Sequence, residues 1–373
     1  MVKMDRHTAA YGSMAAWCSR LRGRWGLLIM LLLAAGGCTG PQEMAGGGTT
    51  APAEDMDYTL VYLLHADADY LYHDREGSPL QADEKMLKEA RAVARKASRG
   101  EVFIFHQRPE KNILGLFPKK DRRMYHYRGG TLVARKSYSP RGETPFRAEA
   151  ALYRSHRREG DSGERSKRIL LYYGHEIPAR PRRGYYQSRP SVLFGSDSFS
   201  EGIARFQGPG TDLFDLVVLS TCNNGTPGMI SNLEGRAHHV LASPQNLHLS
   251  HIDTDPLTAL EDNPALPPAE LADRMADHTF ERMEPWMQTA VTIARYDMQE
   301  VGGYVGDLAR RVEHPFRQGG PKTQGVDNID CARLLPGEAV RSEGVRVWFK
   351  PPAFGRQSDR KNHSGWGCRP PNR

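Results

Sequence analysis

The stretch Leu213-Phe-Asp-Leu-Val-Val-Leu-Ser-Thr-Cys222-Asn-Asn-Gly225 decides the fold that this sequence predicts. Its aliphatic run is short and bounded by turn residues, which is typical of a strand buried on both faces of a parallel sheet. Asn-Asn-Gly favours a turn, so Cys222 is predicted to lie where the strand ends and a loop begins. Ligands of open α/β sheets bind at the carboxyl ends of the strands. Cys222 is therefore a candidate nucleophile, and the alternative is a buried structural cysteine, the commoner fate of a lone cysteine.

A second apolar run, Arg168-Ile-Leu-Leu-Tyr-Tyr-Gly-His175-Glu-Ile-Pro178, has the same form and ends in a histidine. His175 and Cys222 are separated by 47 positions, which leaves room for one crossover, and the segment Phe199 to Phe206 is compatible with a helix. If the two strands are parallel, both residues emerge at the same edge of the sheet. A thiol becomes an effective nucleophile when an imidazole takes its proton or stabilises its thiolate.

At these residues the chain resembles the clostripain-like cysteine peptidases of the caspase-like superfamily, in which one strand ends in the catalytic His and a later strand in the catalytic Cys. Caspases also have their His about 50 residues upstream of the Cys. Other segments are similar to further elements of the family, in the same order along the chain: Tyr58 to Asp67, Met229 to Ser243, Thr289 to Asp297 and Gly344 to Pro351. The resemblance implies an α/β fold, a caspase-like three-layer sandwich with a mostly parallel central sheet flanked by helices. It also implies a cysteine endopeptidase with His175 and Cys222 as its catalytic dyad.

Two residues depart from the family pattern. Glu176 follows the histidine where the family usually has Gly, and Ser220 stands two positions before the cysteine where the family usually has Asp. The resemblance assigns the oxyanion donors to the backbone N–H groups of Cys222 and Glu176, and it places Ser220 at the floor of the pocket for the P1 side chain. The Glu176 departure calls into question how the oxyanion is stabilised. The Ser220 departure calls into question a P1 preference for Arg or Lys. They also favour an alternative, a catalytically inactive caspase-like lipoprotein that acts as a binding or scaffold protein.

The loop after the next predicted strand should line the substrate cleft. That strand is Ala237 to Ser243, and the residues that follow it, Pro244 to Asp253, lie at its carboxyl end. Four polar residues of this loop are candidates for substrate contact: Gln245, His248, His251 and Asp253.

The amino-terminal residues predict an exported lipoprotein. Three arginines precede the apolar run Gly26 to Gly37, which is too short to span a bilayer and has the length of a secretory signal. Cys38 directly follows Ala-Gly-Gly, which looks like a lipobox, so we expect it to be lipidated. The residue after Cys38 is Thr39, which is not acidic, and in this the sequence resembles lipoproteins that are sent to the outer membrane. The alternative is an ordinary cleaved signal with an incidental cysteine.

Net charge gives no reason to expect nucleic-acid binding. The chain carries a formal charge of +7, of which the first 37 residues account for four, so the remainder is at about +3. That balance is ordinary for a globular protein. The expected partners are a protein or peptide substrate and, through the lipid anchor, a membrane.

Composition and periodicity divide the chain into five parts. Residues 1–37 are the predicted signal peptide, and residues 38–56, rich in Gly, Thr, Pro and Ala, a flexible tether. Residues 57–258 are the predicted caspase-like core, which residues 259–316 complete with helices and a strand. Residues 317–373 form a Gly- and Pro-rich tail with one predicted strand at Val345 to Phe349.

Within the core, the segments 58–65, 81–98 and 101–106 predict a strand–helix–strand unit, and residues 123–134 predict a hairpin about Gly129-Gly130. Further helices are expected over residues 144–158, 226–234, 267–283 and 297–311. Asp297 is the expected N-cap of the last of these helices.

No cofactor is predicted. His65, Asp67, Asp69, His73 and Asp74 are close in sequence but lack the spacing of a zinc or EF-hand site, although a structural Ca²⁺ remains open because some relatives need one. A Gly-x-Ser-x-Gly elbow and a Gly-x-Gly-x-x-Gly after the first strand are both absent from the sequence, which argues against other α/β hydrolases and Rossmann enzymes. Cys331 and Cys368 are the two remaining cysteines. They could form a disulfide in an oxidising compartment, and the distance between them, which the sequence does not give, decides whether they do.

Overall fold

The computed structural model describes residues 56–65, 71–73, 79–108, 112–113, 117–118, 122–139, 144–157, 166–186, 189–207, 213–247, 251–283, 289–317, 329–335, 337, 339–353 and 362–368. All of them belong to the unit that spans Ala53–Arg373. The predicted signal peptide, the predicted lipidation site Cys38 and the candidate substrate residue His248 lie outside the described residues. No helix within the described ranges combines the length and apolarity needed to cross a bilayer.

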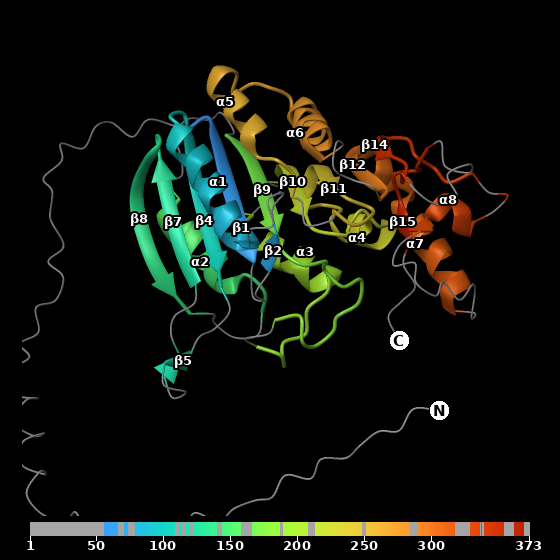
Figure 1. The fold of residues 1–373 in the computed structure, drawn as a ribbon, viewed down its shortest axis with the longest axis horizontal. Helices are drawn as coiled ribbons and strands as arrows, with labels where there is room; N and C mark the ends of the chain where they lie inside the picture. The colour runs from blue at the N-terminus through green and yellow to red at the C-terminus, as the bar shows by residue number, and fades with distance from the viewer. Residues whose placement is uncertain are drawn as a thin grey trace, which may run out of the picture. The chain divides into compact units, whose positions relative to one another are not determined.

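A nine-stranded sheet forms the centre of the fold (Figure 1). Its members in chain order are β1 (Tyr58–His65), β4 (Gly100–Gln107), β7 (Arg122–Arg128), β8 (Thr131–Tyr138), β9 (Lys167–Tyr173), β10 (Phe214–Ser220), β11 (Ala237–Ala242), β12 (Val291–Asp297) and β14 (Val345–Lys350). In space the order is β14-β12-β11-β10-β9-β1-β4-β7-β8. The central strands from β11 to β4 are parallel, and the outer strands on both sides are antiparallel.

The central strands are buried on both faces, which is why their sequences are nearly continuous apolar runs. Every residue of β1 and of β4 is buried. Successive side chains of a strand point to opposite faces. Val61 and Leu63 accordingly pack in one core cluster, and Leu60 and Leu64 pack in another.

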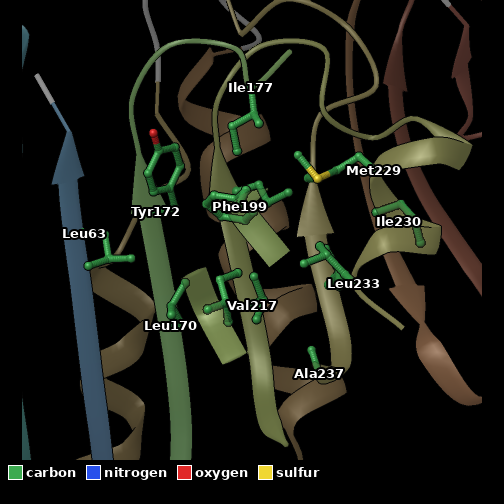
Figure 2. Close-up of a cluster of buried hydrophobic side chains, with 14 of the residues drawn as sticks. Leu63, Leu170, Tyr172, Ile177, Phe199, Val217, Met229, Ile230, Leu233 and Ala237 are labelled. Carbon is green, nitrogen blue, oxygen red and sulfur yellow. The ribbon is translucent and has the colours of Figure 1, made fainter. Parts of the chain in front are cut away.

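Helices cover each face of the sheet, and the helices on one face pack against one of the two core clusters. On one face, the cluster of Leu60 includes residues of α1 (Ala82–Lys96), α5 (Ala259–Asp262) and α6 (Pro268–Met283). On the other face, the cluster of Val61 includes residues of α2 (Arg147–His156), α3 (Ser196–Ala204), α4 (Pro227–Asn232) and α7 (Met298–Arg317). Figure 2 shows part of this second cluster, with Val217 of the sheet and Phe199 and Ile230 of the covering helices among its side chains.

The predicted fold class, a three-layer α/β sandwich with a mostly parallel central sheet, is confirmed. The predicted strand–helix–strand unit is β1, α1 and β4, with β1 and β4 parallel. The predicted hairpin is β7 and β8, and Gly129 and Gly130 both adopt the positive φ that such a turn requires.

The predicted cap at Asp297 is also confirmed, since its carboxylate Oδ1 accepts a hydrogen bond of 3.0 Å from the backbone N–H of Gln299. The helix that follows, α7, runs on to Arg317 and does not stop near Arg311. Its buried apolar stripe, which includes Val301, Val305 and Leu308, packs against the sheet and stabilises the helix despite the glycines at its centre.

The carboxyl-terminal segment is more ordered than its composition suggests. The predicted strand is β14, but the segment also contains β13 (Ile329–Asp330), α8 (Cys331–Leu334) and β15 (Gly367–Cys368). Cys331 and Cys368 form a disulfide with their Cα atoms 5.0 Å apart. Trp366 is fully buried, and its ring packs 4.8 Å from that of Tyr296.

The remaining described elements are short. They are the two-stranded pairs β2 (Leu71–His73) with β3 (Pro79–Gln81) and β5 (Asn112–Ile113) with β6 (Phe117–Pro118), together with the 3-10 turn η1 (Asp255–Thr258).

Removal of the disulfide tests how strongly the carboxyl-terminal segment supports the fold. The double substitution Cys331→Ser and Cys368→Ser should lower the free energy of unfolding by about 2–4 kcal/mol, because the bridge closes a loop with a sequence separation of 37 residues in the unfolded chain. Urea unfolding under oxidising conditions measures this difference, and adding a reductant should abolish it. An unchanged unfolding midpoint in the oxidised double variant would contradict the expectation.

Candidate active site

The candidate catalytic residues lie where two neighbouring parallel strands end. The last residues paired between β9 and β10 are Tyr173 and Ser220. His175 is two residues beyond Tyr173, and Cys222 is two residues beyond Ser220. Both residues are partly buried, and Cys222 packs against the edge of the core cluster that contains Leu60. The prediction that these strands are parallel neighbours is confirmed, and both residues leave the sheet at the same edge and at the same level.

Side-chain amides join the two loops beyond the point where the strands end. Asn223 donates through Nδ2 to Oε2 of Glu176 at 2.8 Å. Asn224 donates through Nδ2 to the carbonyl of Ile177, and its Oδ1 accepts from the Ile177 N–H, both at 2.9 Å. Each pair is 47 positions apart, the same offset that relates Tyr173 to Ser220 and His175 to Cys222. The register of the strands therefore continues through the two loops.

Asn223 has a left-handed backbone with φ of 54°. Asparagine tolerates this conformation better than most residues. Its N–H donates to the carbonyl of Gln245 at 2.9 Å, and its Nδ2 also reaches Oδ1 of Asn246 at 3.1 Å. The loop after Cys222 is thus tied both to the His175 loop and to the segment that follows β11.

Glu176 does not need the conformational freedom of glycine. Among the described residues, the only non-glycine positions with positive φ are Phe146 and Asn223. The backbone of Glu176 therefore lies in the ordinary region for an L-residue, and its carboxylate is hydrogen-bonded to Asn223.

Gly225 allows the chain after Cys222 to turn tightly against Tyr296 and Pro244. A Cβ atom at this position would lie 2.5 Å from the hydroxyl of Tyr296 and 2.7 Å from the backbone nitrogen of Pro244. Its N–H donates to the carbonyl of Ser243 at 2.8 Å, and its carbonyl accepts from the N–H of Gly367 at 3.0 Å. The glycine is therefore required by close backbone approach.

A buried histidine and two tyrosines connect β1 to the backbone of His175. Nδ1 of His65 lies 2.9 Å from the hydroxyl of Tyr172, which lies 2.8 Å from the hydroxyl of Tyr185. The Tyr185 hydroxyl donates to the carbonyl of His175 at 3.0 Å. Burial, with smaller contributions from the charges of Arg122 and His175, holds the pKa of His65 well below its usual range. The imidazole of His65 is therefore neutral and serves as a hydrogen-bonding partner of Tyr172.

The sequence placed His65 at the end of the first strand, without the spacing of a metal site, and did not predict this chain of hydrogen bonds. The available signal was a histidine at the end of an otherwise apolar strand. Asp67, Asp69 and Asp74 lie outside the described residues. Within the described part of the chain, no group of three or more His, Cys, Asp or Glu side chains gathers to hold a metal ion. No calcium site is therefore assigned there.

Two of the predicted substrate residues are buried and hydrogen-bonded to neighbouring segments. The hydroxyl of Ser220 accepts from the N–H of Ile252 at 2.8 Å. Oε1 of Gln245 accepts from the hydroxyl of Thr292 at 2.7 Å. These contacts link the strand ends to the loop after β11.

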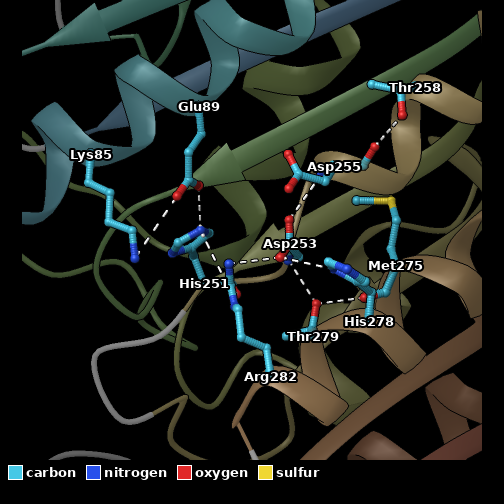
Figure 3. A network of polar contacts seen from close by, with 10 residues as sticks. All are labelled: Lys85, Glu89, His251, Asp253, Asp255, Thr258, Met275, His278, Thr279 and Arg282. Atoms are coloured by element: carbon cyan, nitrogen blue, oxygen red, sulfur yellow. Dashed lines mark hydrogen bonds and ion pairs between the residues drawn. The ribbon is translucent and has the colours of Figure 1, made fainter. Parts of the chain in front are cut away.

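Asp253 belongs to a network of charges, shown with His251 in Figure 3. Its carboxylate lies 2.7 Å from the Arg282 guanidinium and 3.1 Å from the His278 imidazole. Burial alone would raise the pKa of Asp253, but the hydrogen bond from the Asp255 N–H and the neighbouring cations lower it overall. Its negative charge is therefore balanced within the protein, and His251 is likewise paired with Glu89 at 2.6 Å.

Comparison with known proteins gives a match in structure but not in sequence. No protein-family model matches the chain, and no curated protein matches it. An inactive zymogen of a C11 protease from Parabacteroides distasonis is 11% identical and has a TM-score of 0.54, with 84% of this chain and 91% of that chain covered.

Two structures of a secreted C11 cysteine protease from Bacteroides thetaiotaomicron are also similar, each at 11% identity. The one in complex with an irreversible peptide inhibitor covers 70% of both chains with a TM-score of 0.46. The other, named iotapain, covers 70% of this chain and 72% of its own with a TM-score of 0.44. The likeness to the zymogen shows that this chain has the fold of a C11, or clostripain-like, protease.

The neutral state of His65 should make stability depend on pH in a specific window. Because the native imidazole stays neutral while the unfolded one takes up a proton below pH about 6.5, stability is fully present above that pH and falls as pH is lowered. Between pH 6.5 and 5, wild type should lose stability more steeply than His65→Gln, with the difference approaching about 1.4 kcal/mol per pH unit at the lower end. Urea unfolding at each pH provides the measurement.

His238→Gln removes an exposed histidine and is the matched control. It should retain the wild-type slope. Equal slopes for His65→Gln and wild type would show that His65 is not held neutral in the native protein.

Proposed function

We propose that this chain is a clostripain-like cysteine endopeptidase that hydrolyses peptide bonds with His175 and Cys222 as its catalytic dyad. The observation that carries the proposal is the offset of 47 residues, which relates the last paired residues of β9 and β10, the dyad, and the residues joined by Asn224. Tyr173 pairs with Ser220 before the dyad, and Ile177 binds Asn224 after it. His175 and Cys222 lie between these two contacts, so they belong to the same short stretch of the sheet edge. The likeness in fold to a C11 protease zymogen supports the same assignment.

In the proposed reaction, the thiolate of Cys222 attacks the peptide carbonyl carbon, and the C–N bond breaks as a thioester forms. His175 protonates the leaving amine. A water molecule, deprotonated by His175, then attacks the thioester, so that the acid product leaves and the thiol is restored. The partial exposure of both side chains allows peptide and water to enter.

The oxyanion requires N–H donors at the same edge of the sheet. We assign this role to the backbone N–H groups of Cys222 and Glu176. Glu176 has an ordinary φ, so no strain argues against it in the position where the family usually has glycine. Its side chain is held by Asn223, which keeps its peptide group beside the Cys222 loop.

The residues around Ser220 do not favour a basic P1 side chain. Ser220 carries no charge, and Ile252, which donates to it, is followed by Asp253, whose carboxylate is paired with Arg282 and His278. Of the residues predicted to contact substrate, only Asp253 is acidic. We therefore propose that the enzyme does not select Arg or Lys through these residues.

Removal of either member of the dyad tests the proposal. Cys222→Ala should lower kcat/KM by more than about 10³-fold, and His175→Ala by about 10²–10⁴-fold, because the nucleophile and its proton partner are lost. Hydrolysis is measured on a peptide library that varies the P1 residue, and the thiol is labelled with an irreversible peptide probe. His238→Ala, at an exposed position, is the control and should keep wild-type activity.

Full activity of Cys222→Ala would refute the assignment. A wild-type protein that neither cleaves any peptide of the library nor reacts with the probe would instead favour a binding or scaffold protein. The observations that favour this second function are Glu176 and Ser220, which replace residues usual in the peptidases.

We also propose that Cys38 is lipidated and anchors the enzyme to the bacterial envelope, in the outer membrane. The support is the sequence pattern of arginines, a short apolar run and Ala-Gly-Gly before the cysteine. Cys38→Ser should abolish incorporation of labelled palmitate and move the protein from the detergent phase to the aqueous phase. Labelling that persists in Cys38→Ser would contradict the anchor, and an unlabelled wild type would indicate an ordinary cleaved signal.

A further inference from the structure

The backbone pairing of β9 and β10 stops just short of the candidate dyad. The last paired residues are Tyr173 and Ser220, and the next residues of the two chains enter loops. Contacts across these loops come from the side chains of Asn223 and Asn224. These amides therefore help to hold the two loops in register.

Asn224 binds both polar groups of a single residue across the gap. Its Oδ1 accepts from the Ile177 N–H, and its Nδ2 donates to the Ile177 carbonyl, each at 2.9 Å. In a parallel sheet, the neighbouring strand supplies such a donor and acceptor from its backbone. The amide of Asn224 thus replaces one rung of the sheet at a level two residues beyond His175 and Cys222.

The orientation of this amide is set by a third contact. The hydroxyl of Thr221 donates to Oδ1 of Asn224 at 2.5 Å, so that Oδ1 accepts two hydrogen bonds and Nδ2 faces the carbonyl. Thr221, Asn224 and Ile177 are each at most 2% exposed. Water is therefore excluded from these groups, and a lost hydrogen bond there leaves a buried polar atom without compensation.

Hydrogen bonds hold the carbonyl of His175 and the two residues that follow it. Its carbonyl accepts a hydrogen bond from Tyr185, and the next two residues are bound by Asn223 and Asn224. Both asparagines follow Cys222 directly in the chain. A displacement of the Cys222 loop therefore carries the His175 loop with it, and the spacing between the two catalytic groups is preserved.

From these contacts we infer that Asn224 is a positioning residue, whose side-chain amide holds the His175 loop in register with Cys222. The inference rests on the function proposed above. Asn224 is buried, so it acts on the reaction only through the placement of His175 relative to the thiol. A misplacement of about 1 Å between catalytic groups can cost about 10²-fold in rate. The effect should appear in kcat and not in KM.

Asn224→Asp tests this role with little change in shape. At neutral pH the introduced carboxylate still accepts from Ile177 and Thr221, but its other oxygen faces the Ile177 carbonyl without a proton to share. We expect kcat to fall by about 10–100-fold and KM to change by less than about threefold. The ratio of variant to wild-type kcat should rise as pH falls, because the protonated carboxyl regains a donor, and its burial raises the pKa of that group.

The reactivity of the thiol gives a readout that does not depend on a substrate. The rate of Cys222 alkylation by iodoacetamide is followed as a function of pH on the full chain, by mass spectrometry of the peptide that contains Cys222. In wild type, His175 should sustain thiolate below the ordinary cysteine range. In Asn224→Asp, the profile should shift toward the value of about 8.5 found for an isolated thiol.

Asn232→Asp is the matched control. Asn232 donates through Nδ2 to the hydroxyl of Ser196 at 2.8 Å and therefore makes the same kind of contact between α4 and α3. Its substitution should change kcat by less than about twofold and leave the alkylation profile unaltered. Circular dichroism and the thermal midpoint of each variant establish that it is folded.

If Asn224→Asp does not fold, Thr221→Val decides the question. It removes only the hydroxyl that orients the amide, so kcat should fall by about 3–10-fold with an upward shift of the alkylation profile. A folded Asn224→Asp, or failing that Thr221→Val, with wild-type kcat and alkylation profile overturns the inference. A wild type that cleaves no peptide, but whose alkylation profile still shifts in the variant, refutes the proposed protease and supports the positioning role.

Discussion

The parallel pairing of β9 with β10 is the constraint on which the rest of the structure depends. Both strands are buried on both faces, so their pairing cannot slip by one residue without turning apolar side chains such as Leu170 and Val217 toward the wrong cluster. The register fixed in this way determines where each strand ends and which residues follow at the same level. His175 and Cys222 are placed by this core packing before any contact of their own is considered.

Hydrogen bonds from three side chains, which reach it from two directions, then restrict the loop that carries His175. The side chains of Asn223 and Asn224 reach it from the neighbouring loop, and the Tyr185 hydroxyl, in line with Tyr172 and His65, reaches it from the side of β1. These groups are buried or nearly so, which makes each bond costly to lose. The edge of the sheet is therefore held by hydrogen bonds where the proposed chemistry requires fixed geometry, while His175 and Cys222 are only partly buried.

Much of the fold was predictable because burial on both faces leaves a clear sequence pattern. Apolar runs at Tyr58 and Phe214 gave strands with nearly correct ends, and the polar residues after them indicated the functional edge. The contact of Asn224 with Ile177 was not predictable, because Asn-Asn-Gly is also ordinary turn chemistry and only the fold brings Ile177 to its amide. The same holds for the pairing of Asp253 with Arg282, whose side chains meet only after α6 packs on the sheet. Side-chain hydrogen bonds between distant segments have no period that a sequence can display.

The hydrogen bond from the Gly367 N–H to the Gly225 carbonyl has a consequence for how the protein is made. The turn after Cys222 follows strand β10, yet one of its backbone partners is synthesised 142 residues later. Gly367 is followed directly by Cys368, whose bridge to Cys331 retains it. A nascent chain in which Gly367 has not yet been synthesised therefore lacks one hydrogen bond of the turn at Gly225. The native turn requires residues 367–368 and an oxidant that joins Cys368 to Cys331.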